Sequence, residues 1–139
     1  IFKYLVSDYK RYLNILIIII FYRPKSIMEI GVYNGKRATE IIEAAKIFNK
    51  KIKYYGFDLF ENFYNQKNLI VKEHSKFPNT QKKILKLLSN LGSIELFKGF
   101  TSKTLPNFLK KKKFPDLIFI DGGHAIPTIK NDWHYVKKL

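Results

Sequence analysis

The sequence contains no cysteine and very little arginine. Without cysteine, neither a disulfide framework nor a thiolate metal site can form. All but three of the 26 basic residues are lysine, so the side chain best suited to bidentate phosphate or guanine contacts is scarce. The absence of thiols is compatible with a reducing cytoplasm, and we expect a cytoplasmic protein.

A hydrophobic run long enough to span a membrane is also missing. The longest apolar stretch covers residues 13–22, is interrupted by Asn14 and is flanked by Arg11 and Arg23. As a helix it would extend about 15 Å, against a hydrocarbon core of about 30 Å. No small-residue cleavage site follows it, as a secretory signal requires. We expect no membrane span, and interpret residues 1–25 as a helical lead-in to the domain.

Negative charge is scarce as well, since 11 acidic residues leave a net charge of +15. Such a charge attracts nucleic acid and anionic membranes. The lysines are scattered, however, and their one run, residues 110–113, lies where a helix is expected to end and suits the negative end of its dipole. We therefore interpret most of the charge as a composition bias on solvated faces, and keep nucleic-acid binding as an alternative.

The 139 residues fit one domain, and a hydrophobic fraction of 46% supports a packed core. Short apolar runs that end at polar residues predict four strands, at 26–30, 53–57, 93–98 and 116–120. Helical spacing predicts helices between them and after the last, at 36–49, 79–91, 104–109 and from 126 onward. This alternation predicts an α/β fold with a doubly wound (Rossmann-like) parallel sheet, and we expect the strand order 3-2-1-4.

Several residues mark where these helices begin and end. Asn49 is expected to stop the first helix, and Asn79 to cap the second. Thr104 is expected to cap the third, with Pro106 in its first turn. Residues 60–78 are polar and irregular, which indicates a loop as long as an active-site lid.

An acidic residue precedes a glycine loop at the end of the first predicted strand. Glu29 is followed by Gly31 and Gly35 in the stretch IMEIGVYNGKRA, which lacks the G-x-G-x-x-G spacing of dinucleotide sites. A carboxylate here would repel a pyrophosphate and attract a cation, so a ligand with an ammonium group and no phosphate fits better. A glycine loop used for packing alone is the alternative.

A second carboxylate, Asp58, closes the second predicted strand. Ligands of open parallel sheets bind beyond the carboxyl ends of the strands, where this residue falls. Its side chain can accept hydrogen bonds from both hydroxyls of a ribose, whereas the plainer interpretation is a turn aspartate. We expect Glu29 and Asp58 to face a shared pocket.

Four motifs together resemble the class I S-adenosylmethionine-dependent methyltransferases. EIGVYNG is similar to their first motif, GFDLFENF to their ribose-binding strand end, and LFKGFTSKTLP to their adenine pocket. IFIDGGHAIPTIKNDW resembles the motif after the fourth strand in the group of macrocin-type sugar O-methyltransferases and related small-molecule O-methyltransferases. The resemblance runs from Ser26 to Trp133, and we interpret residues 26–139 as the N-terminal part of such a domain.

The resemblance implies S-adenosylmethionine as cofactor and a small molecule or sugar hydroxyl as methyl acceptor. It implies that Glu29 orients the amino-acid end of the cofactor and that Asp58 holds the ribose. The cofactor-binding residues that it implies are Glu29, Gly31, Val32, Tyr33, Gly35, Asp58, Leu59, Gly99, Phe100, Thr101 and Asp121. Tyr33 departs from the pattern, because many members have another glycine there.

The DGGH stretch carries the expected chemistry. Methyl transfer to a hydroxyl needs a base for the acceptor proton, and histidine titrates near neutral pH. The resemblance makes His124 this base and Asp121 a catalytic residue that can also bind Mg²⁺. Further metal ligands would come from a next strand, which this chain lacks. A surface or capping histidine is the alternative for His124.

The family's remaining strands would follow residue 139. We therefore expect an unpaired edge beside the fourth strand, and self-association through it. The alternative functions are an RNA-binding module or RNA methyltransferase, favoured by the charge, a nucleotide-dependent oxidoreductase with the same sheet, and a non-catalytic scaffold.

Overall fold

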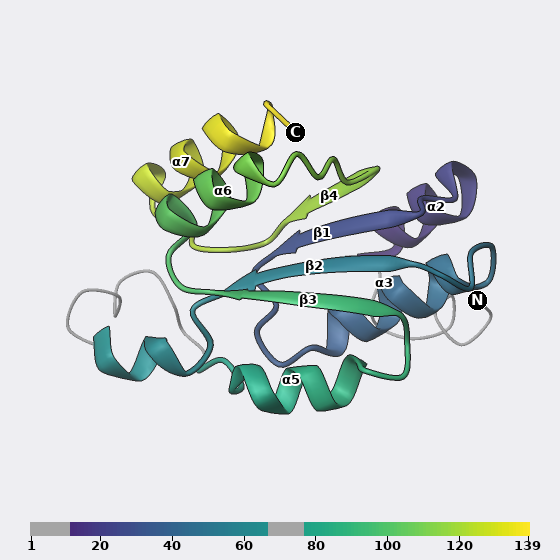
Figure 1. Cartoon of the computed structure of the whole chain (residues 1–139), viewed down its shortest axis with the longest axis horizontal. Coiled ribbons are helices and arrows are strands. Elements are labelled where there is room, and N and C mark those ends of the chain that lie inside the picture. Colours follow the sequence, from purple (N-terminus) through teal and green to yellow (C-terminus); the bar gives the residue numbers. More distant parts are fainter. Residues whose placement is uncertain (1–11, 67–76) are drawn as a thin grey trace.

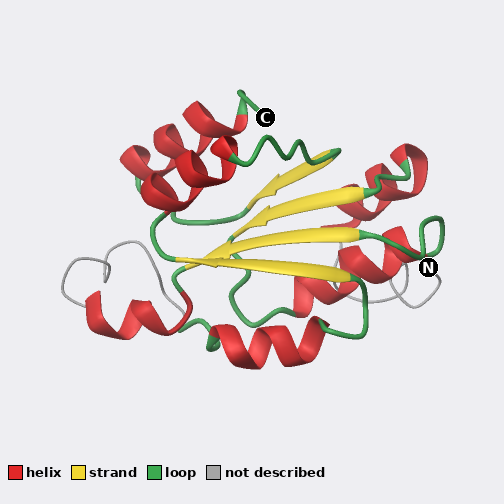
Figure 2. Cartoon of the chain, viewed as in Figure 1, coloured by secondary structure: helices red, strands yellow, loops and turns green. Residues whose placement is uncertain are grey.

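The computed structural model describes residues 12–66 and 77–139. Residues 1–11 of the expected lead-in and residues 67–76 of the expected lid loop lie outside the described residues. All four strand arrows point the same way in Figure 2, and each pairing is parallel. The sheet order is β3-β2-β1-β4. The predicted α/β fold and strand order are therefore confirmed.

The strands are β1 (Ser26–Ile30), β2 (Lys53–Asp58), β3 (Ser93–Lys98) and β4 (Leu117–Ile120). β1 lies between β2 and β4, and every one of its residues is buried. A central parallel strand has both faces covered, which explains why its sequence is nearly all apolar. The chain crosses from β1 to β2 on one side and returns from β3 to β4 on the other, so the switch point lies at the end of β1.

One face of the sheet is covered by α2 (Leu13–Tyr22), α3 (Lys36–Lys46) and α5 (Gln81–Leu88). The apolar spacing of α3 places Ala38, Ile41, Ile42 and Ala45 in this core. The residues that α2 contributes to the same core are Ile15, Leu16 and Ile19. Hence α2 packs on the sheet, and among the described residues no helix is long and apolar enough to cross a membrane.

The opposite face is covered by α6 (Thr101–Lys110) and α7 (Ile126–Val136), as Figure 1 shows. An aromatic cluster holds α6 in place. The rings of Phe57 and Phe97 stack with centroids 4.5 Å apart, and the Phe108 ring meets both edge-on, at 5.5 and 5.3 Å. Edge-to-face pairs of this kind add to the burial energy of the rings. The two helical layers thus give the doubly wound arrangement.

Helix ends differ from the sequence prediction at several points. α5 is capped by Thr80, whose hydroxyl accepts from the backbone N–H of Lys83 at 3.3 Å, and not by Asn79. α6 begins at Thr101, three residues before the expected cap Thr104, and Pro106 lies inside it. The predicted caps Asn79 and Thr104 and the predicted first-turn position of Pro106 were therefore wrong. Several residues that can begin a helix stand close together here, and their local preferences do not decide at which one the helix begins.

Two further segments also depart from expectation. α3 ends at Lys46, although the backbone N–H of Asn49 still bonds the carbonyl of Ala45 at 3.0 Å. The segment predicted as an irregular loop begins with a 3₁₀ helix, η2 (Phe60–Gln66). The interior of the domain is therefore better predicted than the ends of its elements.

The expected open edge beside the fourth strand is present in the described part of the chain, where β4 pairs with β1 alone. Ile120 of β4 is 39% exposed. Three large apolar side chains of α7 are also exposed, namely Ile126, Ile129 and Trp133. These three residues and Val136 recur at the helical spacing from which this helix is predicted. Of the four, Val136 alone is buried.

Gly31→Ala tests the tightest backbone approach in the fold. A Cβ at Gly31 would lie 2.1 Å from the carbonyl oxygen of Asp121, and Gly31 has φ +98°. We expect a loss of more than about 4 kcal/mol of unfolding free energy, because neither backbone segment can move away cheaply. Urea denaturation measures it.

Gly99→Ala is the matched control. Gly99 also has a positive φ, +127°, but the nearest atom to its Cβ would be 3.7 Å away. The cost should therefore be conformational strain alone, about 1–2 kcal/mol. Equal losses in the two variants would contradict the packing argument.

Candidate functional site

A cavity of about 330 Å³ opens at the carboxyl ends of the strands. Volumes of this size suit small-molecule ligands. The structure brings eight of the sequence-predicted site residues to its wall: Gly31, Tyr33, Asp58, Leu59, Gly99, Phe100, Thr101 and Asp121. It does not bring Glu29, Val32, Gly35 or His124 to the wall. The cavity wall therefore contains residues from the loops that follow all four strands.

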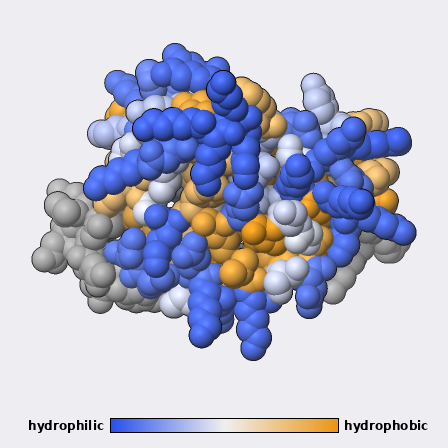
Figure 3. All heavy atoms as spheres, in the orientation of Figure 1, coloured by the Kyte–Doolittle hydropathy of each residue, from blue (hydrophilic) through white to orange (hydrophobic). Residues whose placement is uncertain are grey.

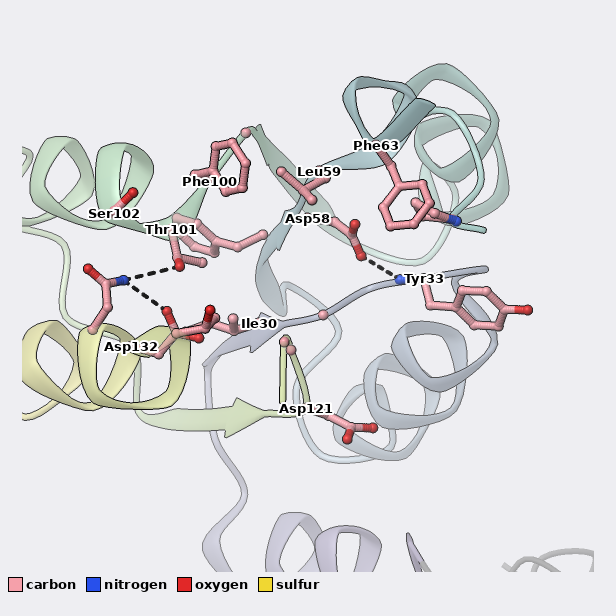
Figure 4. Close-up of a pocket in the computed structure, with 18 of the residues that line it drawn as sticks. Ile30, Tyr33, Asp58, Leu59, Phe63, Phe100, Thr101, Ser102, Asp121 and Asp132 are labelled. Atoms are coloured by element: carbon pink, nitrogen blue, oxygen red, sulfur yellow. Dashed lines mark hydrogen bonds between the residues drawn. The ribbon is translucent and has the colours of Figure 1, made fainter. Parts of the chain in front are cut away.

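Asp58 is held in place from two sides. Its Oδ2 accepts a hydrogen bond of 2.7 Å from the backbone N–H of Tyr33, and its Oδ1 accepts one of 3.2 Å from the N–H of Phe60. The first of these bonds is drawn in Figure 4. A carboxylate oxygen has more than one acceptor site, so each oxygen retains capacity for a ligand hydroxyl.

Tyr33 adopts a backbone conformation that glycine tolerates best. Its φ is +53°, in the left-handed region that L side chains rarely adopt. This conformation turns the backbone N–H of Tyr33 toward Asp58, while the side chain remains 37% exposed at the cavity wall. The loop after β1 is thus tied to the end of β2 by main-chain geometry.

Gly31 brings the loop after β1 against the end of β4. The backbone N–H of Asp121 donates to the carbonyl of Ile30 at 2.8 Å, beside the Gly31 contact. Val32 and Gly35 contribute to packing in the core and not to the cavity wall. Val32 is 2% exposed, and a Cβ at Gly35 would contact side chains of α5. Gly31 shapes the cavity, whereas Gly35 permits α3 and α5 to pack.

Glu29 is fully buried in the core, where the hydroxyl of Tyr54 donates to its Oε2. Its Oε1 has no hydrogen-bond partner among the residues that the structure describes. Burial raises the pKa of this carboxyl to about 8, against the opposing effects of the Tyr54 hydrogen bond and of Arg37. Hence Glu29 is largely protonated at neutral pH. The expectation that Glu29 and Asp58 face one pocket does not match the structure, because desolvation favours a neutral carboxyl packed beneath the loop.

The DGGH loop places its two functional side chains differently. Asp121 lines the cavity, and its Oδ2 accepts a 3.1 Å hydrogen bond from the hydroxyl of Tyr12. Figure 4 shows the Asp121 side chain pointing away from Asp132. His124 is exposed and lies outside the cavity wall. A role for His124 as a base would require an acceptor bound at the rim of the cavity.

No metal centre is formed by the part of the chain that the structure describes. Among residues 12–66 and 77–139, no group of three or more histidine or acidic side chains could hold a metal ion. Asp121 alone cannot supply the several oxygen ligands that Mg²⁺ takes. The described residues therefore do not by themselves support the expected Mg²⁺ site.

An apolar wall follows β2, formed by Leu59 and by Phe63 of η2. Glu61 fastens this segment: its Oε1 accepts from Lys98 Nζ at 2.6 Å and its Oε2 from the backbone N–H of Gln81 at 2.8 Å. The Lys98 hydrogen bond, followed by the Gln81 one, lowers the pKa of Glu61 to about 2. The 3₁₀ helix is thus anchored to β3 and α5, which fixes one side of the cavity.

Sequence reasoning missed the wall that α7 contributes. Asn131 Nδ2 donates to Thr101 Oγ1 at 3.2 Å and to Asp132 Oδ1 at 3.1 Å, joining α6 to α7 (Figure 4). Asp132 is 1% exposed, and a Cβ at Gly122 would lie 3.6 Å from its Oδ2. Asp132 thus lies against the DGGH loop. The spacing of Thr128 and Asn131, one helical turn apart, was the available signal for this wall.

The cavity is acidic in a strongly basic chain. Its lining includes Asp58, Asp121 and Asp132 but no lysine, arginine or histidine among the described residues. Figure 3 shows hydrophilic side chains distributed over the face in view, with apolar residues between them. This arrangement disfavours a phosphate-bearing ligand and favours a cationic one.

Glu29→Gln should remove a pH dependence of stability. The folded protein keeps a proton on Glu29 up to a pKa of about 8, whereas the unfolded chain releases it near 4.5. The wild-type free energy of unfolding should therefore fall, relative to the variant, by a few kcal/mol as pH rises from about 4.5 to about 8.

Urea denaturation at several pH values measures this difference. Glu43→Gln on the exposed face of α3 is the control, and should run parallel to wild type. Parallel curves for wild type and Glu29→Gln would show instead that Glu29 is ionised in the folded protein.

The comparison with protein families matches this architecture. The model of a family described as a methyltransferase domain matches residues 28–139, which is most of the chain. No curated protein matches the chain. The matched segment contains β1 from Met28 onward, the other three strands and every residue of the cavity wall. The chain belongs to this family of methyltransferase domains.

Proposed function

We propose that the protein binds S-adenosylmethionine in this cavity and transfers its methyl group to a hydroxyl of a small molecule or sugar. The observation that carries the proposal is the acidic lining without a basic residue among the described residues. S-adenosylmethionine carries a sulfonium and an ammonium group and no phosphate, whereas nicotinamide dinucleotides carry a pyrophosphate. The lining therefore favours the methyl donor over the dinucleotide alternative.

The residues of the wall suit the parts of this cofactor. The two ribose hydroxyls would donate to Asp58, whose oxygens are oriented by the N–H groups of Tyr33 and Phe60. The flat faces of an adenine would contact Leu59 of the apolar wall and Phe100 after β3. Each charge-assisted hydrogen bond to Asp58 contributes about 1.5–3 kcal/mol. These contacts fix the nucleoside end.

The methionine end would lie over the ends of β1 and β4, along Gly31 and Asp121. When bound, the cofactor supplies an electrophilic methyl group on a positively charged sulfur. The buried, largely neutral Glu29 lies outside the cavity wall. We propose that Glu29 acts on the cofactor through the position of Gly31.

His124 would accept the proton that the acceptor hydroxyl loses during transfer. It lies on the exposed side of the DGGH loop, where an acceptor would approach from solvent. Two glycines, Gly122 and Gly123, separate it from Asp121 and line the cavity themselves. A base placed at the rim can serve acceptors that remain partly in solvent.

Calorimetric titration with S-adenosylhomocysteine tests the assignment of Asp58. Asp58→Ala removes the ribose acceptor and should weaken binding at least about tenfold. Asp58→Asn keeps an oxygen for the N–H of Tyr33 but lacks the charge. Its affinity for S-adenosylhomocysteine should therefore lie between those of wild type and Asp58→Ala. Equal affinities of wild type and Asp58→Ala would contradict the ribose assignment.

The same titration with NAD is the matched ligand control. Wild type should bind S-adenosylhomocysteine and show no saturable binding of NAD, since the cavity wall offers no cation to a pyrophosphate. Binding of NAD alone would overturn the proposed function. Thermal melts of each variant establish that the folded protein is being titrated.

A further inference from the structure

The side of α2 that faces away from the sheet is apolar and exposed. Ile15, Leu16 and Ile19 face the core, and the exposed apolar residues of the helix recur at helical spacing on its other side. These exposed residues are Ile17, Ile18, Phe21 and Tyr22. A helix that is apolar nearly all round is normally buried on all sides. The outer side of α2 is therefore suited to contact with a second apolar surface.

A second exposed apolar segment adjoins the end of α2. Ile47 and Phe48 follow α3 and are exposed. The guanidinium of Arg23, directly after α2, lies 4.9 Å from the centroid of the Phe48 ring. Figure 1 shows the ends of α2 and α3 at the end of the sheet where the strands begin. The apolar patch is defined here as Ile17, Ile18, Phe21, Tyr22, Ile47 and Phe48.

Basic residues border the apolar patch. The exposed side chains of this basic rim are Arg23, Lys25, Lys50, Lys51 and Lys53. The segments after α2 and before β2 lie side by side, because the backbone N–H of Lys53 donates to the carbonyl of Lys25 at 3.0 Å. Glu43, one helical turn before Ile47, is exposed and offsets one of these charges. The border of the patch thus remains strongly positive.

We propose that the apolar patch and the basic rim bind an anionic lipid surface, with Phe21 and Tyr22 at the level of the headgroups. Peripheral binding of this kind grows with the apolar area buried at the headgroup boundary and with the attraction of basic residues to anionic lipids. Lysine and arginine can extend their charged ends past apolar neighbours, and a tyrosine ring with its hydroxyl suits the boundary. The surface of the protein supplies both contributions at one place.

A second copy of the chain fits the apolar patch less well. A two-fold interface brings the same surface of both copies together, so the two basic rims would face each other. Each chain also has a net charge of +15, and like charges oppose association. Anionic headgroups would neutralise the rim instead. Charge complementarity therefore favours the lipid surface.

The proposed lipid-binding surface is separate from the candidate site. The patch lies where the strands begin, whereas the cavity opens at their carboxyl ends. No residue of the patch or of the rim belongs to the cavity wall. Lipid binding need not cover the cavity, and the inference does not depend on the proposed function.

Sedimentation with vesicles tests the apolar patch. Wild type should bind vesicles of equimolar phosphatidylcholine and phosphatidylglycerol at least about tenfold more tightly than phosphatidylcholine alone. Phe21 is 81% exposed, and Phe21→Ala should weaken binding to the mixed vesicles at least about tenfold, because the ring is no longer buried in lipid. Trp133→Ala is the matched control. Trp133 is 61% exposed on α7, over the opposite face of the sheet, and its truncation should leave vesicle binding unchanged.

Two paired lysine variants test the basic rim. Lys50→Gln/Lys51→Gln removes two charges beside the patch and should weaken binding to the mixed vesicles at least about tenfold. Lys130→Gln/Lys137→Gln removes the same charge from exposed positions on α7 and directly after it. Binding by this control should stay within about twofold of wild type, because salt screens distant charges. The comparison separates local attraction from the effect of net charge.

Thermal melts show whether each variant is folded, and the lysine pairs decide the matter if Phe21→Ala is not. Equal binding by wild type and Phe21→Ala overturns the proposal. Equal losses in the two lysine pairs also overturn it, because net charge alone would then cause the attraction. A dimer that Phe21→Ala abolishes, in a protein that does not bind vesicles, would assign the patch to a second copy. Binding of single-stranded RNA without binding of vesicles would assign the rim to nucleic acid. Both results contradict the proposal.

Discussion

The close approach of Gly31 to the backbone of Asp121 is the constraint on which the site depends. It brings the loop after β1 and the loop after β4 into contact at the switch point of the sheet. The N–H of Tyr33 then connects the first of these loops to Asp58 at the end of β2. Three strand ends are thereby joined, two of them through main-chain contacts and the third through the carboxylate of Asp58.

Electrostatics divide the acidic groups of the molecule into two kinds. Asp58 and Asp121 at the cavity wall are partly exposed and accept hydrogen bonds. Glu29 is sealed in the core, where desolvation raises its pKa to about 8 and keeps it largely neutral. A neutral group beneath the loop does not compete with the wall for a cation. The negative potential is therefore concentrated where a ligand would lie.

The fold and the part of the cavity wall that follows the strand ends could be predicted from the sequence. Buried parallel strands and apolar helix faces leave strong periodic signals, and functional residues gather at strand ends, as Asp58 and Asp121 do. The ends of helices leave weaker signals: Thr104 resembles a cap, yet its hydroxyl bonds the carbonyl of Phe100 at 3.2 Å within α6. Such a bond satisfies the threonine equally well inside a helix.

Other features depend on contacts between distant segments. The burial of Glu29 against Tyr54 follows from the packing of β1 beside β2, and a motif that contains an acid does not specify which way the acid points. Nothing in the local sequence around Tyr12 indicates a partner 109 positions away. The wall formed by Asn131 depends in turn on how α7 packs on α6.

Tyr33 contributes its backbone N–H to the site, while its side chain remains exposed at the cavity wall. Since the N–H holds Asp58, the ring can be exchanged for other groups that tolerate a left-handed backbone without breaking that bond. The part of the cavity wall that Tyr33 forms can therefore change in size and polarity while the hydrogen bond that orients Asp58 is kept.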